Sequence, residues 1–330
     1  MKVAKKALKW GFDLSASQFG EHRRRTKTPK LWILMYHRVL PKSDTRYALE
    51  EPGMVVTPET LDLHLRIIKK NFTVVSLSAW LQQAQQGHAL PSHACAVTFD
   101  DGWRDNHEHA LPLLKQHRVP ATLFVVADKV GTDFRFWPNI ISELVAQNSP
   151  TLAQHALFND AAQLARNGFT RDGIAHVIDQ LKAHSEAELF AALEGIGWQS
   201  AIHSGQPALM SWPQVKDMQG SGLIEIGSHT ATHQRLSTGL NPKILEQEIA
   251  GSRTTLEHRM NLPVSLFCFP NGDYDSATLK RVQDTYKAAV TTQHGINRTD
   301  RLNRHELRRI PLHEDGSNSQ QKFLSRLSGW

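Results

Sequence analysis

The sequence predicts an α/β fold built around a parallel sheet or barrel. Short apolar runs alternate along the chain with segments whose apolar residues recur at helical spacing, and this alternation is typical of parallel strands joined by helices. The 330 residues, 40% hydrophobic and 21% charged, are enough for one large domain or two smaller ones with a packed core. Apolar runs of about eighteen residues do not occur, so we expect no membrane-spanning helix.

The predicted elements follow one another in a regular order. An apolar run at residues 31–36 predicts a buried strand that ends at His37. Thr57 and Pro58 indicate the start of a helix, because threonine caps a first turn and proline fits its first position. Further strands are predicted at residues 72–75, 94–99, 119–126, 223–227, 264–269, 288–291 and 307–312, and further helices at 77–86, 110–117, 242–260 and 276–285.

The alternation is interrupted between about residues 131 and 208. Alanine, glutamine, histidine and glutamate dominate this stretch and strand-like runs vanish, so we expect a helical insertion. The expected organisation is a basic amino-terminal arm at residues 1–30, followed by one main domain at residues 31–330 that contains the insertion.

The arm carries most of the net charge. Residues 1–30 hold nine Lys and Arg residues against Asp13 and Glu21, a net charge of +7, whereas the whole chain has +6. Such asymmetry points to an anionic partner for the arm. Residues 3–14 form an amphipathic pattern at helical spacing, with Trp10 and Phe12 on the apolar face. This helix either lies in a membrane interface or packs on the protein's own body.

The start of the chain and its cysteines bear on the compartment. The arm lacks the continuous apolar segment of a secretory signal peptide. Cys95 and Cys268 fall in strand-like runs, which favours buried, reduced thiols over a disulfide. We expect a cytoplasmic protein, and the membrane alternative for the arm adds peripheral contact with the inner face of the cytoplasmic membrane.

Two groups of polar residues follow predicted strands. Asp100 and Asp101 come after the strand at 94–99, and His229 and His233 come after the strand at 223–227. An Asp pair alone is usually a turn or cap, and a lone His pair often faces solvent. Because both pairs follow predicted strands, they are expected to meet at one edge of a parallel sheet. Two histidines four residues apart on a helical turn would also point the same way.

These residues favour metal-assisted hydrolysis. One carboxylate and two imidazoles make a metal triad that leaves positions open for water and substrate. The second carboxylate is then available as a general base.

The two motifs resemble a known family. Residues 98–102 (Thr-Phe-Asp-Asp-Gly) and 229–233 (His-Thr-Ala-Thr-His) are similar to the first two motifs of the NodB-type polysaccharide deacetylases, carbohydrate esterase family 4. The resemblance covers roughly residues 30–130 and 209–315 and leaves the arm and the insertion outside. It implies a distorted (β/α)7 barrel and hydrolysis of N-acetyl groups on amino sugars.

The resemblance also implies a ligand set and a base. A divalent metal, most commonly zinc, with cobalt, nickel or manganese as alternatives, is expected on Asp101, His229 and His233. Asp100 is expected to be the general base of a catalytic domain at residues 31–330.

The chain departs from the family pattern at two places. The arginine that precedes a proline in many members, and orients the base, is missing before Pro270, so Arg309 is the candidate replacement. Many members take the general acid from a histidine near the carboxyl terminus. The early His37 resembles that of the exopolysaccharide-deacetylase branch and is the preferred acid here, with His313 as its competitor.

Three further residues have candidate roles. The backbone N–H of Asn271 is a candidate donor to the oxyanion of the reaction. Trp103 is a candidate wall of a sugar groove, with an ordinary core position as the alternative, and Trp212 is expected in the core.

The expected substrate is an amino-sugar glycan. A basic arm without a signal peptide favours a bacterial surface polysaccharide, lipopolysaccharide or lipid-linked precursor, with peripheral contact to anionic membrane and no nucleic acid. Two alternatives are a non-catalytic glycan-binding protein on the same fold and an amidohydrolase acting on another carbon–nitrogen bond, such as a formamide. A binding protein has no need for Asp100 and His37 beside an intact triad, which argues against the first alternative.

Overall fold

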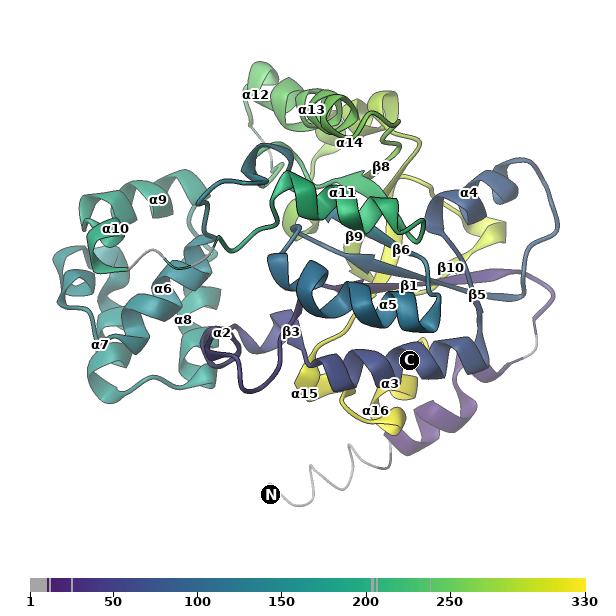
Figure 1. The fold of residues 1–330 in the computed structure, drawn as a ribbon, viewed down its shortest axis with the longest axis horizontal. Coiled ribbons are helices and arrows are strands. Elements are labelled where there is room, and N and C mark those ends of the chain that lie inside the picture. Colours follow the sequence, from purple (N-terminus) through teal and green to yellow (C-terminus); the bar gives the residue numbers. More distant parts are fainter. Residues whose placement is uncertain (1–10, 12, 25, 203–204, 206, 238) are drawn as a thin grey trace.

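The computed structural model describes residues 11–330 except 12, 25, 203–204, 206 and 238 (Figure 1). Within the described residues, seven parallel strands close into a barrel, because β1 pairs with both β5 and β11 and joins the two ends of the sheet. The α/β barrel expected from the sequence is confirmed. In order around the barrel the strands are β1 (Lys30–Tyr36), β11 (Leu307–Pro311), β9 (Ala288–His294), β8 (Leu266–Cys268), β7 (Ile224–Ser228), β6 (Ala121–Val125) and β5 (His93–Phe99).

Short strands extend this framework at its edges. β10 (Asn297–Arg298) pairs antiparallel with β1, and β4 (Thr73–Val74) pairs parallel with β5. β2 (Arg38–Val39) and β3 (Val55–Val56) form a separate two-stranded sheet directly after β1.

One end of the barrel is closed by α4 (Leu77–Gln85). Leu77, Trp80 and Leu81 of this helix belong to the same buried cluster as the small apolar residues inside the strands. Glu225, near the start of β7, accepts hydrogen bonds from the Ser78 backbone N–H at 3.2 Å and from Thr122 Oγ1 at 2.7 Å. Helix α4 therefore covers the amino-terminal end of the barrel, and the predicted site residues lie at the carboxyl end.

Helices cover the outside of the barrel, and those at Pro58, Leu111, Pro242 and Ser276 begin at or next to the predicted positions. Thr57 caps the helix at Pro58 by accepting from the Thr60 N–H, and Asp275 caps the helix at Ser276 by accepting from the Thr278 N–H. The outer helices are α2 (Thr45–Leu49), α3 (Pro58–Asn71), α5 (Leu111–His117), α11 (Trp212–Gly220), α12 (Pro242–Glu246), α13 (Ser252–Met260), α14 (Ser276–Thr285), α15 (Glu314–Ser317) and α16 (Gln320–Arg326).

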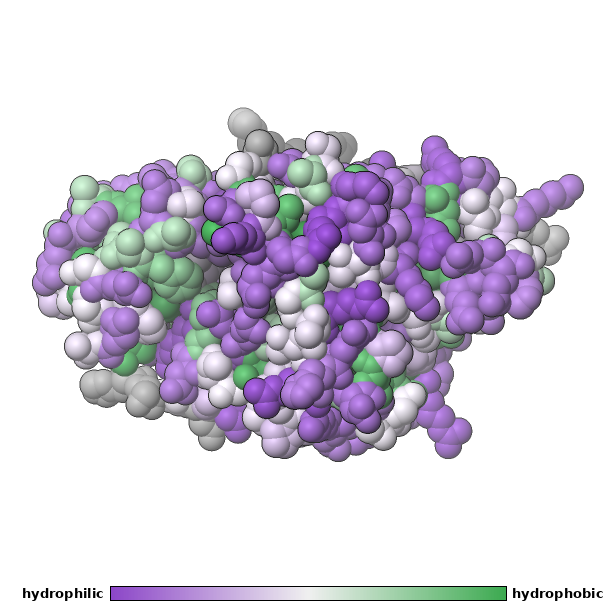
Figure 2. All heavy atoms as spheres, turned by 90° about the horizontal axis from the view of Figure 1, so that it is seen from above, coloured by the Kyte–Doolittle hydropathy of each residue, from purple (hydrophilic) through white to green (hydrophobic). Residues whose placement is uncertain are grey.

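Between β6 and β7 most of the described chain is helical, and residues 137–202 have a core of their own. Their buried side chains form one cluster separate from those of the barrel. Figure 1 shows this unit in teal beside the barrel, and Figure 2 shows hydrophobic spheres gathered at the same end of an otherwise largely hydrophilic face. The helices are α6 (Trp137–Ala146), α7 (Asn159–Asn167), α8 (Arg171–Leu181), α9 (Glu186–Gly195) and α10 (Trp198–Ala201).

The described part of the arm packs on the body of the protein. Residues 13–19 are helical, Ala16 is fully buried, and Ser325 Oγ of α16 donates to Asp13 Oδ1 at 2.8 Å. The Glu21 N–H donates to the Ser328 carbonyl at 2.7 Å. Most of the predicted amphipathic helix at residues 3–14, namely residues 3–10 and 12, lies outside the described residues. Among the described residues, no helix is both long and apolar enough to cross a membrane.

Candidate active site at the carboxyl end of the barrel

Asp100 stands at the end of β5 and is held by a buried arginine. Arg309 of β11 donates from Nη1 to Oδ1 and from Nη2 to Oδ2, both at 2.7 Å. The Arg309 residue is 0% exposed and Asp100 is 2% exposed. The structure thus brings the proposed replacement arginine into a two-pronged contact with the proposed base, the geometry in which guanidinium and carboxylate bind best.

Further hydrogen bonds hold the Arg309 side chain in place, and its guanidinium determines the charge state of Asp100. Its Nε donates to the Thr291 carbonyl at 2.9 Å and its Nη1 donates to Thr98 Oγ1 at 3.1 Å. Burial alone would raise the pKa of Asp100, but the adjacent guanidinium outweighs burial and lowers that pKa. Asp100 is therefore a carboxylate at neutral pH, as a proton acceptor must be.

Asp101, His229 and His233 converge on a common point beside Asp100. The Nε2 atoms of His229 and His233 lie 3.2 and 3.5 Å from Asp101 Oδ1. Their candidate ligand atoms all lie within 4.8 Å of one another. The fold thus brings together the three residues that the sequence predicted as a metal triad.

The loop that carries the two histidines is not helical, so the expected helical turn is wrong. Thr230 and His233 have positive φ values of 63° and 71°. The carboxylate of Glu248 accepts from the N–H groups of Ala231 and Thr232, and the His233 N–H donates to Thr230 Oγ1. These bonds satisfy the backbone in place of helical ones and turn both rings toward Asp101.

The donor set fits a divalent metal. Asp101 keeps Oδ1 toward the two imidazoles because its Oδ2 accepts from Trp103 Nε1 at 2.7 Å. Although burial opposes it, hydrogen bonding from His229 and the nearby histidines lower the pKa of Asp101, so it is ionised. His229 Nδ1 lies 2.9 Å from the Cys268 carbonyl oxygen. A proton on Nδ1 would be donated to this carbonyl, so Nε2 is the nitrogen left to bind a metal.

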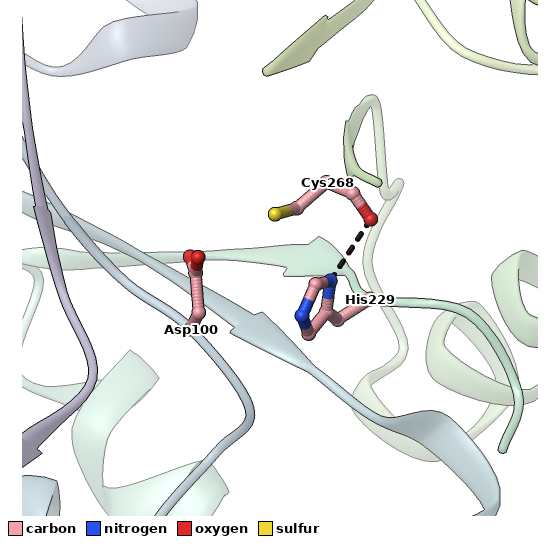
Figure 3. A group of neighbouring side chains, drawn as sticks. All are labelled: Asp100, His229 and Cys268. Carbon is pink, nitrogen blue, oxygen red and sulfur yellow. Dashed lines mark hydrogen bonds between the residues drawn. The ribbon is translucent and has the colours of Figure 1, made fainter. Parts of the chain in front are cut away.

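A second group of donors shares His229 but fits less well. Figure 3 shows the side chains of Asp100, His229 and Cys268 around one space. Their candidate ligand atoms all lie within 4.8 Å of one another. Burial raises the pKa of Cys268 well above its usual value, so the thiol keeps its proton. Asp100 is also already occupied by Arg309. The set containing Asp101 is the better metal site.

His37 reaches the site from the end of β1, whereas His313 does not line it. His37 Nε2 is 3.8 Å from Asp100 Oδ2, and the ring is partly exposed to the cavity. His313 occupies the position before the first residue of α15, and its Nε2 lies 2.7 Å from Arg326 Nη2. The geometry favours His37 over His313 as the group that meets a substrate.

The turn after β8 places Asn271 at the cavity. Asn271 has a positive φ of 53°, and its carbonyl accepts from Thr292 Oγ1 at 3.1 Å. Gly272 follows at φ 77°, and a Cβ there would lie 2.1 Å from Thr292 Oγ1. Glycine is therefore required at position 272 for this turn to close.

Trp103 lines the site cavity, but most of its side chain is buried beside Asp101. It is 2% exposed, donates to Asp101, and carries the Arg38 guanidinium 4.2 Å from its ring centre. Arg38 in turn donates to Asp105 and Glu50. Through this buried stack Arg38, the residue after His37, contacts Trp103, which is the hydrogen-bond donor to Asp101. Trp212, expected in the core, is half-buried and packs against the main hydrophobic cluster.

The site opens into a cavity of about 290 Å³ that the insertion helps to line. A larger cavity of about 890 Å³ at the closed end of the barrel contains Glu225 and none of the predicted site residues. The insertion contributes residues to which the sequence assigned no role, because only the tertiary placement of α6, α8 and α9 brings them to the barrel. They are Phe136, Trp137, Asn139, Lys182, His184 and Glu186.

Comparison with known proteins gives matches along most of the chain. The sequence profile of the polysaccharide deacetylase family matches residues 87–289. The Bacillus subtilis (strain 168) protein YxkH, whose name includes the term polysaccharide deacetylase, is 24% identical over 280 residues. That match spans 83% of this chain and 68% of YxkH.

Solved structures share the fold at low sequence identity. The Streptococcus pyogenes deacetylase PplD in complex with acetate has a TM-score of 0.61 and 19% identity, over 92% of this chain and 100% of PplD. IcaB from Ammonifex degensii has a TM-score of 0.56 and 20% identity, over 90% and 97% of the two chains. A de-N-acetylase from Aggregatibacter actinomycetemcomitans has a TM-score of 0.53 and 18% identity, over 85% and 94%.

Proposed function

The chain belongs to the polysaccharide deacetylase family, and from this premise we propose that it removes N-acetyl groups from amino sugars of a bacterial surface polysaccharide, lipopolysaccharide or lipid-linked glycan precursor. Membership makes it a hydrolase of amide bonds in polysaccharides. The observation that carries the finer proposal is the ionised Asp100, clamped by Arg309 beside a carboxylate and two imidazoles. The de-N-acetylase among the structural neighbours supports the acetamide as the group attacked.

Asp101, His229 and His233 are proposed to hold a divalent ion, with zinc first and cobalt, nickel or manganese as alternatives. When bound, such an ion supplies Lewis acidity that polarises the substrate carbonyl. Trp103 keeps the Asp101 carboxylate turned toward the histidines through its indole N–H.

Asp100 is proposed to accept the proton of the attacking water. Its lowered pKa keeps it ionised at neutral pH, and the two Arg309 contacts hold its oxygens in one orientation. A base held in this way is ready for each turnover without rotating.

His37 is proposed to give a proton to the leaving nitrogen. Its Nε2 lies 3.8 Å from Asp100 Oδ2, and its ring lines the cavity. The Asn271 backbone N–H is proposed to donate to the carbonyl oxygen as negative charge develops there. The products are acetate and a free amino sugar.

The reaction is tested by measuring acetate release from N-acetylated saccharides and lipid-linked sugars, with formate measured in parallel. Acetate release by the metal-loaded protein and its loss in Asp100→Asn are the expected results. Formate release without acetate would replace the proposal by deformylation, and no release from any substrate by well-folded, metal-loaded protein would refute it.

Contact with anionic membrane is proposed for the end of the molecule where the arm meets the carboxyl terminus. Leu14, Phe19 and Trp330 are 39%, 65% and 50% exposed there, and the Arg24 guanidinium lies 5.9 Å from the centre of the Trp330 ring. Exposed apolar and basic side chains together suit the surface of anionic lipid. On this proposal the protein works at the inner face of the cytoplasmic membrane.

Co-sedimentation with anionic vesicles tests the membrane proposal. Phe19→Ser should weaken binding, whereas the control Ile244→Ser, at a 47% exposed position on α12, should not. Binding should also fade as salt is raised. Equal binding by both variants and the parent would refute the proposal.

A further inference from the structure

The two proposed imidazole ligands differ in how their outer nitrogen is supported. His229 places Nδ1 against the Cys268 carbonyl at 2.9 Å, a partner supplied by the barrel. His233 Nδ1 is buried and makes no hydrogen bond to any described residue. A metal-binding histidine needs a partner for its second nitrogen, because that partner fixes the tautomer and the ring orientation.

A carboxylate from the insertion faces this orphaned nitrogen. Glu186 Oε1 lies 3.6 Å from His233 Nδ1, and the Glu186 side chain is only 14% exposed. Glu186 is the first residue of α9, directly after the helix cap Ser185. The distance is longer than a hydrogen bond, and a small rotation of the glutamate side chain closes it.

Other contacts hold the insertion against the same loop. Arg235, two residues after His233, donates from Nη1 to the Lys182 carbonyl at 2.9 Å. The Phe136 ring packs edge-on against the His233 ring, with centres 4.9 Å apart and planes at 83°. The insertion therefore contacts the His233 loop in three ways: through the Glu186 carboxylate, through the hydrogen bond from Arg235 to a backbone carbonyl, and through the Phe136 ring.

We propose that Glu186 is a positioning residue for the metal site, through His233. Its carboxylate accepts the Nδ1 proton of His233, keeps the ring in the tautomer with a lone pair on Nε2, and aims that lone pair at the ion beside Asp101. Glu186 does not touch the ion. This inference rests on the proposed function in one respect, the assignment of His233 as a ligand.

Zinc affinity of the metal-free protein, measured by competition with a chromophoric chelator, tests the inference without any substrate. Glu186→Ala should bind zinc about 10–100-fold more weakly than the parent. Glu186→Gln, which keeps the shape and loses the charge, should fall between the two. The matched control is Glu188→Gln, in the same first turn of α9 but facing solvent, where its carboxylate caps the helix. It should bind zinc like the parent.

A spectroscopic readout separates orientation from general loosening of the fold. In the zinc-bound parent the Nδ1 proton of His233 should give a downfield proton resonance, absent from His233→Ala, and Glu186→Ala should lose it. Parent-like zinc affinity and an intact resonance in both Glu186 variants would overturn the inference.

The failure of this inference is distinguishable from the failure of the proposed function. If His233→Ala loses zinc while both Glu186 variants retain it, only the role of Glu186 is wrong. If His233→Ala itself retains parent-like affinity, the ligand assignment fails and the role of Glu186 fails with it.

Discussion

Replacement of Arg309 by methionine is the most informative perturbation of this site. Methionine fills much of the same space but removes the guanidinium that meets both oxygens of Asp100. Arg309 is fully buried and Asp100 nearly so, so the variant leaves a buried carboxylate without its partner. Removal of one member of a buried ion pair typically costs about 3–5 kcal/mol. The lost bonds to the Thr291 carbonyl and Thr98 place Arg309→Met toward the upper part of that range.

Urea denaturation of the metal-free proteins at pH 7 measures this loss as a difference in the free energy of unfolding. Arg309→Met combined with Asp100→Asn should regain about half of it, because the lone charge is gone. Arg298→Met is the control, since Arg298 pairs with Asp300 at the surface and its loss should leave the unfolding free energy unchanged within error.

The same variant should also lose activity. Without Arg309 the proposed base Asp100 is no longer held in one orientation, and turnover should fall about 10²–10⁴-fold, the usual contribution of a general base. A loss of stability below about 1 kcal/mol, or a double variant less stable than Arg309→Met alone, would show that Arg309 does not compensate the charge of Asp100.

The other predictions concern the metal, the acid and a buried histidine. Chelation should abolish activity and zinc should restore it; by elemental analysis His233→Ala should lose metal whereas Asp100→Asn should keep it. His37→Ala should cut turnover about 10²–10⁴-fold with metal retained, whereas His313→Ala should have little effect on the rate of acetate release. Burial lowers the pKa of His64 to about 4, so the unfolded state binds its proton first as pH falls. The free energy of unfolding should therefore fall by up to about 3 kcal/mol between pH 6.5 and 4, measured against His64→Gln; a pH-independent difference would contradict this reasoning.

Strands, helices and their starts were predictable because their signals are local. The strand before Asp100 is an apolar run, and the helix after Thr57 begins with a cap and a proline. The positions of Asp100 and His229 at strand ends followed from the same runs, and parallel pairing then brought the two together.

The remaining features depend on contacts between distant parts of the chain. Spacing alone favoured a helical turn between His229 and His233, but the carboxylate of Glu248 bonds the intervening backbone instead. No local sequence pattern marks Glu186, because its position beside His233 depends on how the insertion packs against the barrel. The sequence left two alternatives for the arm, a membrane interface or packing on the body of the protein. The described part of the arm packs on the body, as the buried Ala16 shows.

The left-handed backbone at the site sets a limit on engineering this enzyme for heat resistance. Asp101 and His233 have φ values of 73° and 71°, a conformation that costs a side-chain-bearing residue roughly 1–2 kcal/mol compared with glycine. Glycine at either position would relax the chain and remove a proposed metal ligand. A screen that rewards thermal survival alone would therefore drift toward stable, inactive proteins, and a useful library keeps these two positions fixed while it varies the helices.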